Sequence, residues 1–201
     1  MKKIIVMLAV CGLAAGAHAA DGDQAFLARL KADFRARGIA GMDRLDQDKV
    51  QALCSNTPHV DELPREQVRA LEQEQLETIR YPADNKFLGD WKKGEALAQD
   101  GRGMTWSDKA GAPAGGNCYN CHQLAPSEVS FGTLGPSLRH YGRIHGNTAE
   151  SQLYTWSKIY NAKAFNMCTN MPRFGHKGVL TESQIKDLVA LLLDPESPVN
   201  K

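Results

Sequence analysis

Apolar residues recur at helical spacing in the first part of this chain. In residues 23–38 they return every three or four positions and therefore share one helical face. Residues 43–55 and 64–82 show the same period in narrower stripes, with Pro64 suited to a first helical turn and Pro82 to a helix end. The pattern predicts three amphipathic helices, whose apolar positions are Phe26, Leu27, Leu30 and Phe34, then Leu45, Val50 and Leu53, then Val68, Leu71, Leu76 and Ile79.

The second half of the chain repeats this period. Residues 85–101, 147–165 and 181–195 each predict a helix, and Thr181 with Gln184 forms a capping box at the start of the last one. No segment alternates apolar and polar residues over a useful strand length. The sequence therefore predicts an all-α fold, with apolar positions at Phe87, Leu88, Trp91 and Leu97, at Leu153, Trp156, Ile159 and Tyr160, and at Ile185, Leu188, Val189 and Leu192.

Charge and composition divide the chain into two parts. Residues 21–82 contain no tryptophan and carry a net negative charge, whereas residues 83–201 are slightly positive. The narrow apolar stripes of the first part need a surface to lie on, because short amphipathic helices are not stable alone. We therefore expect a helical extension at residues 21–82 and a separate domain at residues 83–201.

The overall composition limits the classes of partner. The formal net charge is +1 and the hydrophobic content is 42%, an ordinary value for a globular protein. This balance argues against nucleic acid or an anionic membrane surface as the main partner.

Residues 1–20 have the layout of a secretory signal peptide. Two lysines precede an apolar run that is shorter than the about 20 residues of a membrane span. A small-x-small signature follows, so we expect cleavage near Ala19 or Ala20 and a mature protein in the periplasm, without a membrane anchor. Cys11 within the run raises lipid attachment as an alternative, but Val10 precedes it where a small residue is expected. Plain export is therefore favoured.

The run Cys118-x-x-Cys121-His122 carries the clearest chemical signal. A structural zinc site usually needs a second pair of ligands, and a thioredoxin-like motif needs a βαβ setting. Neither accompanies the run. Two thiols one helical turn apart can each bond a haem vinyl group, and the adjacent histidine then faces the iron from the same side. The motif therefore predicts one covalently attached haem c, with Cys118 and Cys121 as its anchors and His122 as an axial iron ligand.

The second axial ligand decides the kind of haem chemistry, because methionine favours electron transfer and an open face favours ligand binding. Met171 is the best candidate, since Pro172 stiffens a loop between two predicted helices. Met167 is a rival for which core filling is the preferred interpretation, and Met104 is a weaker candidate. Histidine ligation is disfavoured at His140, His145 and His176.

A short Gly-Pro segment follows the cysteine motif. The backbone carbonyl of Pro136 is in a position to accept a hydrogen bond from the second ring nitrogen of His122 and thereby fix the ring. A Gly-Pro turn is common in loops, so the signal gains weight only because it comes soon after a haem motif.

Together these pieces resemble a class I cytochrome c. More narrowly, the segments GNCYNCH, GTLGPSL, NMCTNMPRFGHKGVLTESQIKDLVALL and DPESPVN resemble the SoxX subunits of the SoxAX cytochrome complexes of thiosulfate oxidation, over about residues 85–200. The resemblance implies a haem core of three to four helices at residues 83–201. It also implies that Cys118 and Cys121 hold the haem, that His122 and Met171 are its axial ligands, and that Pro136 orients His122.

The resemblance also implies a setting. SoxX-like subunits pair with a SoxA-like cytochrome subunit in the periplasm, and the complex joins thiosulfate oxidatively to a cysteine of the SoxY carrier protein (L-cysteine S-thiosulfotransferase activity). The catalytic haem belongs to the SoxA-like partner, and the SoxX-like subunit passes electrons to a small cytochrome c. Two alternatives stay open: a free-standing electron carrier, and a haem sensor with an open iron face.

Three expectations concern the extension and its surroundings. We expect residues 21–82 to wrap around the partner subunit, with packing on the chain's own haem domain as the alternative. In an oxidising compartment the remaining cysteines, Cys54 and Cys168, predict a disulfide that ties the extension to the Met171 region. A ring of basic residues for docking a partner is a further possibility, and an ordinary solvated surface is at least as good an interpretation of Lys158, Lys163, Arg173 and Lys177.

Overall fold

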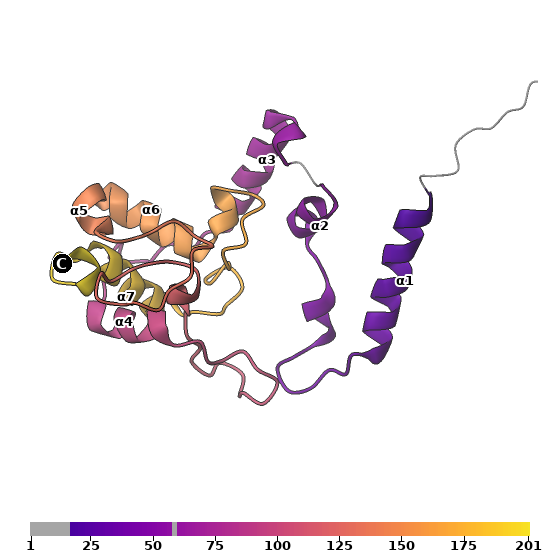
Figure 1. The fold of residues 1–201 in the computed structure, drawn as a ribbon, viewed down its shortest axis with the longest axis horizontal. Coiled ribbons are helices and arrows are strands. Elements are labelled where there is room, and N and C mark those ends of the chain that lie inside the picture. The colour runs from indigo at the N-terminus through magenta and orange to yellow at the C-terminus, as the bar shows by residue number, and fades with distance from the viewer. Residues whose placement is uncertain (1–16, 58–59) are drawn as a thin grey trace, which may run out of the picture.

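The computed structural model describes residues 17–57 and 60–201 (Figure 1). These residues form an all-α protein, as the sequence predicts, and the only β pairing among them is an isolated bridge between Arg37 and Ala40. No helix in this part of the chain is long and apolar enough to cross a membrane. The α-helices are α1 (Ala17–Asp33), α2 (Lys49–Asn56), α3 (Arg65–Leu76), α4 (Trp91–Gln99), α5 (Tyr141–His145), α6 (Ala149–Tyr160) and α7 (Glu182–Leu193).

Most of the predicted signal peptide, with Cys11, lies outside the described residues. Short 3-10 turns complete the described part, at Met42–Leu45, Val60–Glu62, Cys118–Asn120, Ala162–Ala164 and Pro198–Asn200.

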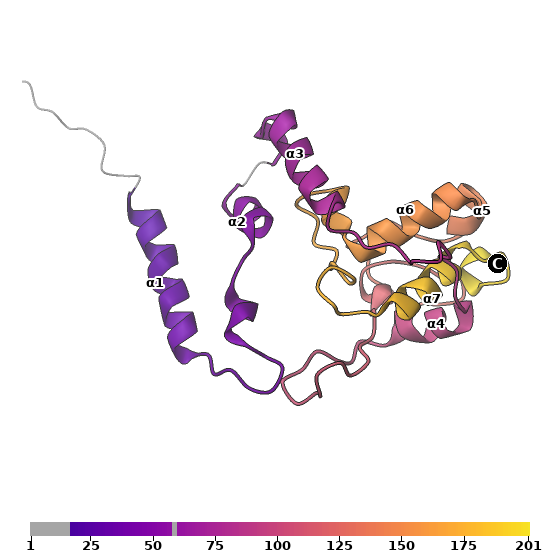
Figure 2. The same cartoon turned by 180° about the vertical axis from the view of Figure 1, so that it is seen from behind.

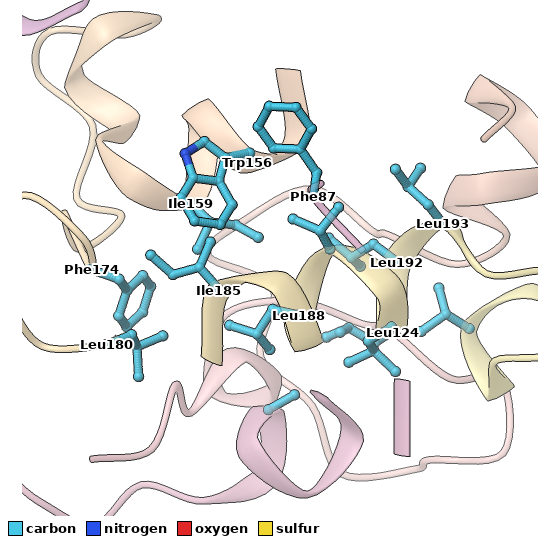
Figure 3. Close-up of a cluster of buried hydrophobic side chains, with 14 of the residues drawn as sticks. Phe87, Leu124, Trp156, Ile159, Phe174, Leu180, Ile185, Leu188, Leu192 and Leu193 are labelled. Atoms are coloured by element: carbon cyan, nitrogen blue, oxygen red, sulfur yellow. The ribbon is translucent and has the colours of Figure 1, made fainter. Parts of the chain in front are cut away.

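Helix α7 is the centre of the main core (Figure 3). The predicted capping box is present: the Thr181 side chain accepts a hydrogen bond from the backbone of Gln184, whose side chain accepts one from the backbone of Thr181. A helix that is apolar on nearly all sides has to be covered by other elements. Neighbours from α4, α6 and the intervening loops cover the buried residues Ile185, Leu188, Val189, Leu191, Leu192 and Leu193.

Helices α4 and α7 lie against each other at a glycine. A Cβ atom at Gly94 would overlap the backbone carbonyl of Asp187 and would lie 3.0 Å from Cβ of Leu191. The Asp187 side chain also accepts a hydrogen bond of 2.8 Å from the backbone of Asp90, which caps α4. The close crossing therefore depends on the absence of a side chain at Gly94.

Residues 197–200 join α5 to the end of α7. Asn200 is buried, and its side-chain oxygen accepts a hydrogen bond of 2.8 Å from the backbone of Gly142 in α5. Its side-chain nitrogen donates to the carbonyls of Leu192 and Asp194 at the end of α7. The Ser-Pro-Val-Asn segment thus connects α5 and α7 through the hydrogen bonds of Asn200.

The extension divides into two parts that behave differently. Helices α2 and α3 lie on the haem domain, where Val50 and Leu71 enclose Met167 in a second apolar cluster. Helix α1 stands apart from α4–α7 in both Figure 1 and Figure 2, and Phe26 on its apolar stripe is 69% exposed. Packing on the chain's own domain, the alternative raised from the sequence, thus describes α2 and α3. The apolar stripe of α1 is left exposed by the residues that the structure describes.

Several helix boundaries differ from the prediction. The segment 43–55, expected to be one helix, forms a 3-10 turn at Met42–Leu45 and then α2, because Asp48 caps a new helix start. Helix α4 begins only at Trp91 because Asp90 caps it, and Leu88, expected to point inward, is 39% exposed. Leu153 is likewise 43% exposed. The short helix α5 was not predicted from the sequence.

Candidate haem site

The cysteine motif forms a tight turn. Asn117 before it adopts a left-handed backbone conformation with φ of 48°, and Cys118–Asn120 then makes one 3-10 turn. The backbone nitrogens of Cys121 and His122 both donate to the carbonyl of Cys118, at 3.1 and 2.9 Å. This turn brings Cys118 and His122 to the same pocket. Both Cys118 and Cys121 have free thiols, as attachment to a haem requires.

The ring of His122 is held by a backbone carbonyl. Its Nδ1 lies 2.8 Å from the carbonyl oxygen of Pro136. A carbonyl oxygen only accepts, so Nδ1 carries the proton and Nε2 keeps a free lone pair for a metal. The polypeptide passes close behind the ring at Gly135, where any Cβ atom would overlap the imidazole. The geometry expected for Pro136 and His122 is therefore present.

An apolar pocket opens in front of this ring. Burial raises the pKa of the Cys118 thiol to about 12, which keeps that sulfur neutral. Apart from the imidazole and two sulfur atoms, the walls are hydrocarbon, which fits a porphyrin face. The lining residues are Cys118, His122, Leu124, Leu138, Ile159, Met171, Phe174, Leu188, Leu191 and Leu192.

Met171 is the methionine that reaches this pocket. It lies in the loop of residues 166–175, called the Met171 loop below, and its backbone nitrogen donates to the Thr169 hydroxyl at 3.2 Å. Met167 does not line the pocket and is 1% exposed in the second apolar cluster, in agreement with a core-filling role. Met104 is 36% exposed and also lies outside the lining.

None of the three other candidate histidines lines the pocket. The His145 ring lies against Tyr141 with ring centroids 4.4 Å apart. Burial and the nearby cations Arg173 and Lys177 lower the pKa of His176. His140 has a left-handed backbone, and its Nδ1 is buried without a hydrogen-bond partner in the described part of the chain.

The cysteine pair predicted from the sequence forms a disulfide. Cys54 in α2 is bonded to Cys168 in the Met171 loop, with Cα atoms 5.4 Å apart. Within the described residues, no group of three or more His, Cys, Asp or Glu side chains gathers in the manner of a metal site. The idea of a basic docking ring needs correction, because Lys163 and Arg173 are 8% and 6% exposed and are unavailable to a partner's surface.

One polar contact of the site was missed in the sequence. Tyr119, between the two cysteines, is buried, and its hydroxyl donates to the carboxylate of Glu95 at 2.9 Å. The same hydroxyl accepts from the backbone of Ala125 at 3.3 Å. Burial raises the pKa of Glu95, and it also raises that of Tyr119. An aromatic residue inside the motif was the available signal, and the contact fixes the motif turn to α4.

Comparison with known proteins agrees with this geometry. Residues 91–194 match the family model described as Cytochrome c. The chain is also 41% identical over 159 residues to a protein of Aquifex aeolicus (strain VF5) named "Uncharacterized lipoprotein", an alignment that covers 77% of this chain and 73% of the relative.

The fold, the apolar pocket and the motif at its mouth define an electron-transfer haem protein of the c type. The chain belongs to the cytochrome c family, whose members carry covalently bound haem c.

Proposed function

We propose that this protein is the electron-transfer subunit of a SoxAX-type complex, with one haem c per chain. The observation that carries the proposal is the meeting of Cys118, His122 and Met171 in one apolar pocket, beside segments that resemble SoxX subunits. The haem supplies reversible one-electron chemistry when bound. His122 and Met171 would hold the iron as its two protein ligands, which favours electron transfer over catalysis by this chain.

The chain's own residues have defined tasks in this proposal. Cys118 and Cys121 fix the porphyrin edge, and His122 presents Nε2 because Pro136 accepts the proton of Nδ1. Met171 would supply the thioether. Leucines from α7 line the pocket with hydrocarbon and would surround the haem with apolar side chains.

The reaction served by the complex is the oxidative joining of thiosulfate to a cysteine of a SoxY-type carrier. Forming that sulfur–sulfur bond from thiosulfate and a thiol releases two electrons and one proton. The catalytic haem would belong to a SoxA-like partner. This chain would receive the electrons one at a time and pass them to a small cytochrome c.

Helix α1 is the part of the extension that best fits a partner-wrapping role. Its stripe carries Phe26 at 69% and Leu30 at 39% exposure, whereas α2 and α3 already cover the haem domain. Burial of such side chains on association would be favourable by about 25 cal/mol per Å² of apolar surface. We therefore assign heterodimer contacts to α1.

Export to the periplasm is proposed on the signal-like residues 1–20 and on the relative's name as a lipoprotein. That name gives the lipid-anchored alternative at Cys11 more weight than the sequence alone does. The mass of the mature N-terminal peptide decides between them. A start near Ala20 supports plain export, and a start at a diacylglyceryl Cys11 contradicts it.

The test of the proposed function is a native mass spectrum of the protein isolated from its own periplasm. A mass of this chain plus one haem, bound to a second haem-bearing subunit, is the expected result. A lone monohaem monomer at every concentration would contradict the complex and favour the second candidate, a free-standing electron carrier. The free-standing carrier would use the same pocket, but it gives no reason for the exposed apolar residues of α1.

A further inference from the structure

The Met171 loop is attached to the extension by a covalent bond. The Cys54–Cys168 disulfide joins α2 to the loop three positions before Met171, across a sequence separation of 114 residues. The backbone of Met171 can therefore move only within the short reach of the chain between Cys168 and the methionine.

An ion pair between a buried arginine and a partly exposed carboxylate holds the other side of the same loop. Arg173, two positions after Met171, has a side chain that is 4% exposed, and its guanidinium donates to the carboxylate of Asp48. The Gln75 side-chain oxygen in α3 accepts from the same guanidinium at 3.3 Å. Burial raises the pKa of Asp48, but the hydrogen bonds from the Gln51 backbone and from Arg173 outweigh that effect and lower it.

Two further contacts fix the beginning of the loop. The Met167 backbone nitrogen donates to the Glu72 carboxylate of α3 at 3.1 Å, and its side chain packs against Val50 and Leu71. Lys163 lies beneath the loop and donates to the carbonyls of Met167 and Thr169, at 2.9 and 3.4 Å. The described residues that hold the loop thus come mainly from residues 48–75.

We propose that residues 48–75 act as a clamp that positions Met171 on the haem iron, with Asp48, Arg173 and the disulfide as positioning residues. The inference rests on the proposed role of Met171 as axial ligand. The loop brings the thioether into the pocket only while Cys168 and Arg173 stay anchored on its two sides. When the anchors are released, the loop gains conformations in which Met171 leaves the iron, and the bound fraction falls.

The proposal assigns the extension a task in the chain's own electron transfer. A looser thioether lowers the reduction potential, because methionine ligation raises it. It also opens the ferrous iron to external ligands. A purely structural extension would change the unfolding free energy and leave the spectrum of the folded protein unaltered.

The test uses the full-length holoprotein and two independent variants, Asp48→Asn and the pair Cys54→Ala with Cys168→Ala. The introduced asparagine keeps an oxygen that can cap α2, so this variant retains its helix start while losing the charge that Arg173 requires. Glu74→Gln is the matched control, because it breaks an ion pair of the same extension, between Glu74 and Lys49, in which both partners are exposed.

The readouts are the ferric methionine-to-iron charge-transfer band in the near-infrared, the reduction potential, and carbon monoxide binding by the ferrous protein. We expect both clamp variants to shift the equilibrium between bound and free thioether by roughly tenfold. Asp48→Asn leaves the buried Arg173 guanidinium without its charge partner, and loss of the disulfide removes the covalent tie of the loop. The band weakens, the potential falls, and carbon monoxide binding rises, while Glu74→Gln matches the wild type.

Two outcomes overturn the inference, and they are distinguishable. If the wild type shows the band and folded clamp variants keep its intensity and potential, Met171 is positioned without the extension. If the wild type itself lacks the band, Met171 ligation fails and the proposed function loses its axial ligand pair. Circular dichroism of each variant establishes that the comparison is made on folded protein.

Discussion

The two proposed axial ligands are held in opposite ways. On the His122 side the anchors of the ring are local: Gly135 donates to the Cys121 carbonyl at 2.8 Å, and Pro136 accepts from the ring itself. The longer contact of the motif turn, from Tyr119 to Glu95, spans 24 positions. On the Met171 side the anchors come from residues 95 to 125 positions away, through the Met167–Glu72 and Arg173–Asp48 contacts. The loop at Gly135 and Pro136 can position His122 as soon as the neighbouring cysteine motif has folded. The Met171 loop is held in position only when residues 48–75 have also folded against it.

This difference indicates which of the two proposed ligands is more sensitive to changes elsewhere in the chain. A contact between residues far apart in the sequence closes a longer loop and therefore has a larger entropic cost. Such contacts can also be lost locally while the cysteine motif stays folded. We therefore expect changes in the extension to alter the methionine side first and to leave the histidine side intact. Four experiments test or sharpen that contrast.

Removal of the disulfide has the largest expected effect on stability. Opening a loop of more than 100 residues by Cys54→Ala with Cys168→Ala lowers the free energy of unfolding by about 4 kcal/mol in the chain-entropy model. Urea unfolding of the holoprotein measures this loss, with the neighbouring exposed change Ser55→Ala as control. A loss below about 1 kcal/mol would show that residues 48–75 do not depend on the covalent tie.

The histidine side is broken most directly by Gly135→Ala. The added methyl group overlaps the His122 ring, so the ring or the backbone must shift, at an expected cost of about 1–3 kcal/mol. Denaturant unfolding and the histidine signals in the spectrum of the paramagnetic protein report the change. Ser137→Ala, which removes two exposed hydrogen bonds, to the Gln123 side chain and from the Arg139 backbone, is the control. Unchanged spectra in Gly135→Ala would contradict the close contact between the backbone at Gly135 and the His122 ring.

The ion pair between Asp48 and Arg173 predicts a pH dependence. The pKa of Asp48 is lower in the folded protein than in the unfolded chain, so its contribution to stability is present above the unfolded pKa and is lost as pH falls through the folded pKa. Stability should therefore decline as the pH falls below about 4. The free energy of unfolding, measured at several acidic pH values, should change less with pH for Asp48→Asn than for the wild type. The same pH dependence in both proteins would contradict the pairing.

The smallest effect on stability is expected in α1. Phe26→Ser with Leu30→Ser changes two exposed side chains, so the free energy of unfolding should stay within about 0.5 kcal/mol of the wild type. Affinity for the proposed SoxA-like partner should nevertheless weaken, as sedimentation of mixtures would show. Strong destabilisation without loss of affinity would assign α1 to this chain's own fold.

The fold could be predicted well wherever short-range signals decide it. The capping box at Thr181 and the apolar period of α7 identify that helix, and both are present. Ile79 was expected on a helix, but α3 ends at Leu76 and Ile79 is buried from the following turn. Helix boundaries were less predictable because a single cap, such as Asp90, can override a continuous apolar period.

The site followed the same division. The motif turn and the His122–Pro136 contact depend on residues within 14 positions of each other, so the cysteine motif and the Gly-Pro segment soon after it indicate them. The contacts of Arg173 with Asp48 and of Tyr119 with Glu95 join separate helices and loops, and no local pattern encodes them. This is why Arg173, considered for a surface ring in the sequence, is buried. Lys163 is also buried, against the carbonyls of Met167 and Thr169.

The most direct test of the account is the ferric near-infrared charge-transfer band, compared between Met171→Leu and Met167→Leu holoproteins. Both changes keep an apolar side chain of similar volume in the same loop. The account predicts that the wild type and Met167→Leu show the band and that Met171→Leu lacks it. A band that persists without Met171, or disappears without Met167, would contradict the assignment of the axial ligand on which both proposals depend.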